Sequence, residues 1–167
     1  SAVKAKDVKE EFGNKIKYIL DGGACAIGIE STIVNLIGRP SILRLGGLDI
    51  LKIQKTLNFK ISISINPKKK IAPGQSRLHY SPGIPLRMNV TKPKNDEAFI
   101  IIKRKKTKLK NYFYLTNKNN LDEAAKNLYS CLRNIKNEGY KSIAVEKIPN
   151  KGLGKAINDR LRRASKY

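Results

Sequence analysis

Residues 28–47 of the 167-residue chain read GIESTIVNLIGRPSILRLGG. Most residues of 32–37 and 41–45 are apolar or β-branched, and a Gly-Arg-Pro turn at 38–40 separates the two runs. Short apolar runs joined by turn residues at this spacing predict two antiparallel strands. The polar trio Glu30-Ser31-Thr32 and the glycine pair Gly46-Gly47 flank these runs. The stretch therefore predicts a strand pair that presents small polar groups and open backbone to a ligand.

The residues around this stretch predict further short elements. Residues 7–12 have the pattern of the end of a short helix, stopped by a glycine and an asparagine. Residues 16–20 are predicted to form a strand that runs into the Asp21-Gly22-Gly23 turn, and residues 49–57 a helix. The glycines at 22 and 23 are compatible with close approach to a ligand or, more simply, with a tight turn.

Proline and glycine are dense between residues 58 and 85 and oppose regular structure there. Residues 61–65 alternate isoleucine with serine, a pattern that fits one short strand. A segment of this length without regular structure is unusual inside a compact domain, so we interpret it as a functional linker.

A second pattern follows the linker. Strands are predicted at 98–102, 111–115 and 142–146, with a helix from Asn120 to Asn137 and another over 152–165. Asn120 is a favourable N-cap, and the apolar residues that follow it repeat at helical spacing. The order strand, strand, helix, strand, helix predicts a small α/β layer with parallel pairing.

The composition limits the partners and the chemistry. Lys and Arg total 35 against 13 Asp and Glu, so the net charge is +22 and a polyanionic partner is plausible. No apolar run approaches the roughly 20 residues of a membrane helix. Two cysteines, Cys25 and Cys131, and one histidine predict free thiols in a reducing cytoplasm, with neither a disulfide framework nor a protein zinc site.

Two segments carry the candidate binding residues. Arg44 lies inside an apolar strand, where its fixed charge requires an anion such as phosphate or an edge that faces solvent. In the linker, Tyr80 offers a ring face and a hydroxyl, whereas packing or a hydrogen bond is favoured over general-base catalysis for His79. The basic runs at 68–70 and 103–106 are expected to be solvated surface, with tRNA contact as the alternative.

The ordered set of motifs resembles the threonylcarbamoyl-AMP synthases of the Sua5/YrdC family, of the longer two-domain Sua5 type. The motifs are Asp21-Gly-Gly, Gly28-Ile-Glu-Ser-Thr, Ile42-Leu-Arg-Leu-Gly-Gly, Ala72-Pro-Gly, His79-Tyr-Ser-Pro and the C-terminal run Gly152-Leu-Gly-Lys-Ala-Ile-Asn-Asp-Arg-Leu-Arg-Arg-Ala.

The resemblance implies an α/β fold in three parts. Residues 1–57 would be the C-terminal portion of a YrdC-like twisted open sheet, 58–85 an extended linker, and 86–167 a small Rossmann-like Sua5 domain. Family members also carry a Lys/Arg-rich motif and a Ser-x-x-Asn motif, which bind ATP and threonine and are absent from these 167 residues. The chain by itself is therefore expected to be inactive.

The resemblance further implies a cytoplasmic nucleotidyltransferase of tRNA t6A37 modification. In this family, threonine and bicarbonate give a carbamate that attacks the α-phosphate of ATP, releasing pyrophosphate and forming threonylcarbamoyl-AMP. Mg²⁺ would be bound through the phosphates, and tRNA and the enzymes of t6A transfer are expected partners. Such a transfer depends on positioning and cations, so no catalytic side chain and no protein metal ligand is assigned.

By position, the resemblance gives roles to four residues. Ser31 matches the family serine that contacts threonine, and Arg44 and Tyr80 match residues that contact ATP. Ser1 matches a further ATP-contacting serine, although the chain reads Ser1-Ala-Val where the family has Ser-Pro-Thr. Ser81 replaces the alanine usual in the linker motif.

Two other interpretations stay open. The chain is also compatible with a non-catalytic basic module that binds RNA or nucleotides, whose affinity would fall steeply with salt. Alternatively it has no function alone, because an interrupted sheet leaves open edges; in that case the region after Pro85 should resist proteolysis better than residues 1–57.

Overall fold

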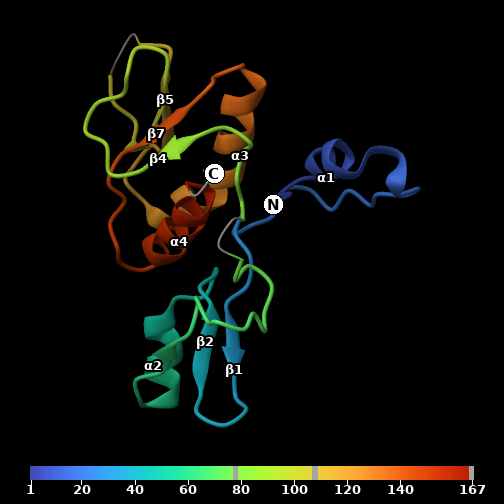
Figure 1. Ribbon diagram of the computed structural model, residues 1–167, viewed down its shortest axis with the longest axis vertical. Coiled ribbons are helices and arrows are strands. Elements are labelled where there is room, and N and C mark those ends of the chain that lie inside the picture. Colours follow the sequence, from blue (N-terminus) through green and yellow to red (C-terminus); the bar gives the residue numbers. More distant parts are fainter. Residues whose placement is uncertain (77–78, 107–108, 166–167) are drawn as a thin grey trace.

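A computed structural model describes residues 1–76, 79–106 and 109–165 of the chain. Its strands form a three-stranded and a four-stranded sheet, each with its own helices (Figure 1). The larger sheet is parallel throughout. The predicted α/β class with parallel pairing is confirmed.

The N-terminal segment is less regular than predicted. Helix α1, Ala5–Phe12, and the single-turn η1, Gly13–Lys15, agree with the predicted helix end. The strand predicted over residues 16–20 is wrong, because no strand forms there. Tyr18 and Leu20 are 78% and 97% exposed, so no neighbouring strand or apolar layer stabilises an extended strand at these residues.

The small sheet has the order β1-β2-β3. Strand β1, Ile33–Asn35, pairs antiparallel with β2, Ser41–Arg44, as predicted, and β2 pairs parallel with β3, Ser62–Ile63. Strand β1 ends earlier than predicted because Leu36 and Ile37 are strongly exposed. Helix α2, Ile50–Leu57, starts at Asp49, whose carboxylate accepts a hydrogen bond from the Leu51 N–H at 3.0 Å.

One buried glutamine fixes the segment that follows β3. Gln75 is 3% exposed, and its carbonyl oxygen accepts hydrogen bonds from the backbone N–H groups of Ile71 and Ala72. Its amide donates to the backbone oxygens of Leu43 and Ser64 at 3.1 and 3.2 Å. A single side chain thus replaces the backbone pairing that a proline-rich segment cannot make.

The parallel sheet has the order β4-β7-β5-β6. Its strands are Leu86–Arg87 (β4), Ala98–Lys103 (β5), Tyr112–Thr116 (β6) and Ile143–Val145 (β7). Three of them agree with the sequence prediction, and β4 was missed because two residues carry no periodic pattern. The central strand β5 is buried at its first five positions, as expected for a strand covered on both faces.

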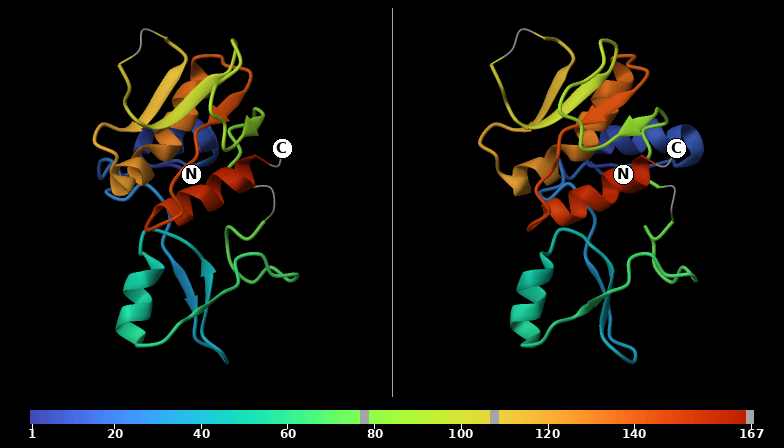
Figure 2. Two further views of the ribbon diagram at one scale, coloured as in Figure 1. Left: turned by 90° about the vertical axis from the view of Figure 1, so that its left-hand side faces the viewer. Right: turned by 60° about the vertical axis from the view of Figure 1, so that its left-hand side comes forward.

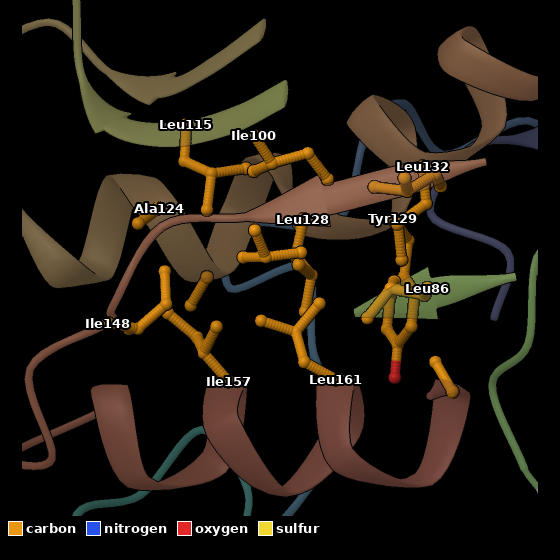
Figure 3. Packing of buried hydrophobic residues seen from close by; sticks show 14 of the residues in the cluster. Leu86, Ile100, Leu115, Ala124, Leu128, Tyr129, Leu132, Ile148, Ile157 and Leu161 are labelled. Atoms are coloured by element: carbon orange, nitrogen blue, oxygen red, sulfur yellow. The ribbon is translucent and has the colours of Figure 1, made fainter. Parts of the chain in front are cut away.

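Helices α3, Leu121–Asn137, and α4, Gly154–Ala164, both pack on this sheet. Asn120 caps α3 as predicted, since its side chain accepts from the N–H groups of Asp122 and Glu123. Figure 3 shows Ile157 and Leu161 of α4 pointing toward Leu128 of α3 in the main core, all three fully buried. The apolar spacing in the sequence therefore predicts which face of each helix is buried.

Helix α4 also reaches the small sheet. Its Ala156 packs in the second core with Ile42, Leu45 and Ile50. Figure 2 shows α4, in red, lying between the parallel sheet and the part that holds β1, β2 and α2. The division at residues 57 and 85 remains a prediction, and α4 joins the parts on either side of it.

Candidate functional site

Arg44 and Ser31 lie side by side at the end of the small sheet. Arg44 is the last residue of β2 and half-buried, and Ser31 lies just before β1. The Arg44 Nε donates to the Ser31 backbone oxygen at 3.0 Å, and its Nη2 donates to the Ser31 Oγ at 3.1 Å. These bonds orient the guanidinium and leave its remaining N–H groups for an anion.

The Gly46-Gly47 turn brings the end of β2 against the segment before β1. The Gly47 N–H donates to the Glu30 backbone oxygen at 2.9 Å, and the Gly46 N–H donates to the Thr32 Oγ1 at 3.1 Å. A Cβ on Gly46 would lie 2.2 Å from the Ser31 carbonyl carbon. Only glycine fits at this position, so the turn fixes Ser31 relative to Arg44.

The other glycine pair takes no part in this arrangement. Gly22 and Gly23 are exposed, and a Cβ on either would meet no atom within 4 Å. The Gly23 N–H donates to the Asp21 Oδ1 at 2.9 Å, which closes a local Asx-type turn. Of the two interpretations for this pair, the tight turn describes the structure.

Tyr80 approaches Arg44 from the linker. Its backbone has φ of +65°, a left-handed conformation that is uncommon for an aromatic residue. A Cβ built on Gly74 would lie 2.5 Å from the Tyr80 hydroxyl and 3.0 Å from the Arg44 Cδ, so both side chains pass close to this glycine. Burial raises the pKa of Tyr80, which keeps its hydroxyl protonated.

Glu30 faces the C-terminal half of the chain instead of an open ligand site. Its carboxylate accepts hydrogen bonds from the Ser1 hydroxyl, from the Tyr129 hydroxyl at 3.1 and 3.2 Å, and from the Arg160 Nε at 3.0 Å. Burial by itself raises the pKa of Glu30, but the Arg160 charge and these hydrogen bonds outweigh burial and lower it. The carboxylate is therefore ionised at neutral pH.

The structure thus brings the four predicted site residues, Ser1, Ser31, Arg44 and Tyr80, to one region around Glu30. Tyr129 and Arg160 also belong to this region, although the sequence motifs did not indicate them. Arg160 lies three and four residues from Ile157 and Ala164, on the apolar side of α4. A charged residue on the apolar face of an amphipathic helix indicates a buried ion pair, and Arg160 has this pattern in the sequence.

A cavity of about 630 Å³ opens beside Ser1 and Tyr80. Neither Ser31 nor Arg44 lines it. Its lining residues are Ser1, Asp7, Glu10, Glu11, His79, Tyr80, Ser81, Pro82, Tyr129, Leu132, Arg133, Lys136 and Asn137. Burial lowers the pKa of His79, so its imidazole is neutral at pH 7.

The remaining candidates are consistent with structural roles. Cys25 and Cys131 are both free, and burial raises the pKa of the Cys131 thiol to about 12. The basic runs at 68–70 and 103–106 are exposed as expected. In the described ranges, no three His, Cys, Asp or Glu side chains come together as a metal site. No helix there is long and apolar enough to cross a membrane.

Comparison with known families divides the chain in two. Residues 45–166 match the family described as the C-terminal domain of threonylcarbamoyl-AMP synthase, and residues 1–46 match the family described as telomere recombination. The threonylcarbamoyl-AMP synthase of Pyrococcus abyssi is 33% identical over all of this chain and 54% of its own length. Those of Schizosaccharomyces pombe and Bacillus subtilis are 29% and 27% identical over 96% and 99% of the chain.

Solved structures agree with these matches. The crystal structure of P. abyssi Sua5 complexed with L-threonine superposes with a TM-score of 0.83 at 31% identity, covering 99% of this chain and 54% of that protein. A P. abyssi Sua5 variant with a histidine and a tyrosine replaced by alanine gives a TM-score of 0.78 at 29% identity. The chain spans about half the length of the curated relatives it matches.

Proposed function

The chain belongs to the threonylcarbamoyl-AMP synthase family of the Sua5 type, and from this premise we propose that its residues serve in L-threonylcarbamoyladenylate synthesis for tRNA t6A37 modification. In this reaction a carbamate made from threonine and bicarbonate attacks the α-phosphorus of ATP. The new P–O bond joins the carbamate to AMP, the bond to the β-phosphate breaks, and pyrophosphate leaves. The polypeptide would act as a nucleotidyltransferase in the cytoplasm.

The observation that carries the proposal is the contact between Arg44 and Ser31, with Tyr80 close to Arg44. The guanidinium is oriented by two bonds to Ser31, with N–H groups left for a phosphate, and the neighbouring hydroxyl suits a small amino acid. We assign Ser31 to threonine and Arg44, Tyr80 and Ser1 to ATP. The P. abyssi structure contains L-threonine, which supports an amino-acid substrate for the family fold.

The linker assignment has independent support. A histidine and a tyrosine were replaced together in the P. abyssi variant, and in this chain the single histidine, His79, directly precedes Tyr80. Their rings are in contact, with centroids 3.9 Å apart. We propose that this pair covers the nucleotide base or phosphates from the linker side.

Mg²⁺ fits this chemistry as an ion carried by the ATP phosphates and not by the protein. The residues around Arg44 supply hydroxyl and guanidinium groups, whereas Mg²⁺ prefers carboxylate and phosphate oxygens. When bound, the ion would offset the charge that develops on the leaving pyrophosphate. The chain's own contribution is to hold the α-phosphate beside Arg44 and to orient the threonyl group near Ser31.

The test uses the gene product that contains these 167 residues, because we propose that the chain alone is inactive. It should release pyrophosphate from ATP only with both threonine and bicarbonate. Arg44→Ala should weaken Mg-ATP binding by about 1.5–3 kcal/mol, the range for hydrogen bonds to charged groups. Arg39→Ala, an exposed arginine in the turn after β1, is the matched control. An ATP affinity equal in both variants would overturn the role of Arg44.

The net charge of +22 favours a second candidate, a basic module that holds tRNA without catalysis. In that case tRNA affinity falls steeply with salt while no pyrophosphate forms under any condition. Filter binding between 50 and 300 mM salt, run beside the pyrophosphate assay, separates the two functions. We expect the protein to form pyrophosphate and also to bind tRNA. The tRNA and the enzymes of t6A transfer would be its downstream partners.

A further inference from the structure

Three charged residues of α4 form a buried cluster between the two sheets. Asp159, Arg160 and Arg163 have side chains that are 4%, 1% and 5% exposed. The Asp159 Oδ2 accepts from the Arg160 Nη1 at 3.0 Å and from the Arg163 Nε at 3.1 Å. Buried charges are retained only when they are paired, so Asp159 fixes the direction of both guanidinium groups. We call these three residues the α4 charge cluster.

Arg163 holds the linker at two places. Its Nη2 donates to the Ile65 backbone oxygen at 2.8 Å and to the Asn66 Oδ1 at 3.1 Å. Its Nη1 donates to the Ser76 backbone oxygen at 2.8 Å. One planar guanidinium therefore binds both ends of the segment 65–76, an arrangement that an ammonium group cannot reproduce.

Arg160 connects Tyr80 of the linker to Glu30, which lies just before β1. Its guanidinium lies 4.9 Å from the Tyr80 ring centroid, and its Nε donates to the Glu30 Oε2 at 3.0 Å. The Tyr80 ring is 5.9 Å from that of Tyr129, so the tyrosine is contained between α4 and α3. These contacts compensate for the left-handed backbone of Tyr80.

We propose that Arg160 and Arg163 are positioning residues that hold linker residues 65–76 and Tyr80 beside the Ser31–Arg44 site. The C-terminal helix would thereby act on the binding site through the linker. The nucleotide-binding consequence rests on the proposed function, whereas the effect on the linker rests on the contacts above alone. The two consequences can be measured separately.

The first experiment measures linker opening without any ligand. Lys68, Lys69 and Lys70 are exposed within the held segment, so the endoproteinase Lys-C reports how often it opens. Arg163→Gln should speed cleavage there by about ten-fold or more, because cleavage follows the population of the open form. Cleavage after Lys15, distant from α4 in the chain, is the internal reference and should not change.

Two further variants keep this test decisive. Arg162→Gln replaces an exposed arginine of the same helix and should leave all cleavage rates unchanged. Arg163→Lys keeps the charge beside Asp159 but loses the fork, so it should still release the linker even where Arg163→Gln does not fold. Cleavage at 68–70 within two-fold of the Arg162→Gln rate, or equal acceleration at Lys15, would overturn the proposal.

The second experiment measures Mg-ATP binding by the gene product that contains this chain. Arg160→Gln should raise the Kd by about ten-fold, as should Tyr80→Ala, and the double variant should be no weaker than either single variant. Tyr80→Phe keeps the ring on Arg160 and should retain part of the affinity. Additive losses, or an unchanged Kd for Arg160→Gln, would refute the positioning role.

The outcomes distinguish the two proposals. If the wild-type protein fails to bind Mg-ATP but Arg163→Gln still releases the linker, the proposed function fails and the linker-holding role survives. If ATP binds and Arg44→Ala weakens it while the Arg163 variants leave the linker closed, the proposed function stands and the α4 charge cluster has no positioning role.

Discussion

Replacing Glu30 with glutamine tests the junction between the two halves of the chain. The Glu30 side chain is 21% exposed and pairs with Arg160, whose side chain is 1% exposed. Glu30→Gln removes the charge but keeps one carbonyl oxygen that can still accept hydrogen bonds. Arg160 would then retain only Asp159 as an anionic partner, and its Nη2 already has no hydrogen-bond partner among the described residues.

The expected loss of unfolding free energy follows from this burial. Breaking a buried ion pair by removing one partner costs about 3–5 kcal/mol. Partial exposure of Glu30 and the retained amide oxygen place the Glu30→Gln loss at about 2–3 kcal/mol. With a urea m-value of about 1–3 kcal/mol/M, the unfolding midpoint should fall by about 0.7–3 M.

The assay is urea unfolding at pH 7 followed by far-ultraviolet circular dichroism. Glu10→Gln is the matched control, because Glu10 is 40% exposed and lies 3.8 Å from both Lys6 and Arg133. Exposed pairs of this kind contribute less than about 1 kcal/mol. Equal midpoints for the Glu30→Gln and Glu10→Gln proteins would refute the inference that Glu30 joins the two halves.

The pH dependence gives a second readout of the same carboxylate. Burial opposes ionisation of Glu30, but Arg160 and the hydrogen bonds hold its pKa below the ordinary value of 4.5. A carboxylate with a lowered folded-state pKa stabilises the protein above its unfolded pKa, and this stability is lost as the pH falls through the folded pKa. The difference between wild type and Glu30→Gln should therefore be constant from pH 8 to 6 and shrink below about pH 4.5. A difference unchanged at pH 3 would contradict this reasoning.

Two further predictions concern the glycine pairs and the thiols. Gly46→Ala should destabilise the chain by about 1–3 kcal/mol in urea unfolding, because the new Cβ meets the Ser31 backbone at 2.2 Å, whereas Gly22→Ala should be neutral; similar values for both would contradict the close packing at Gly46. A thiol reagent such as DTNB should label exposed Cys25 rapidly and half-buried Cys131, with its pKa of about 12, much more slowly until the protein unfolds. Two fast-reacting thiols in the native protein would show that Cys131 is accessible.

Local sequence signals predicted the elements whose stabilisation is local. Asn120 marked the start of α3, and the apolar residues after it fixed the buried face of that helix. The strand predicted at residues 16–20 was wrong because a short apolar run pairs only where a neighbouring strand or apolar layer exists. Strand β4 was missed because Leu86 and Arg87 become a strand only by pairing with β7.

The binding roles of Ser1, Ser31, Arg44 and Tyr80 come from the family resemblance and remain a proposal. The sequence alone determined the α/β class and the antiparallel pairing of β1 with β2. These depend on residue type and short-range spacing, which a linear chain displays directly. Only the tertiary structure decided that Glu30 points to α4, since its bond to Arg160 joins residues 130 positions apart. A buried charge is costly unless an opposite charge lies beside it. Which residue supplies that opposite charge depends on the folded structure and not on distance along the chain.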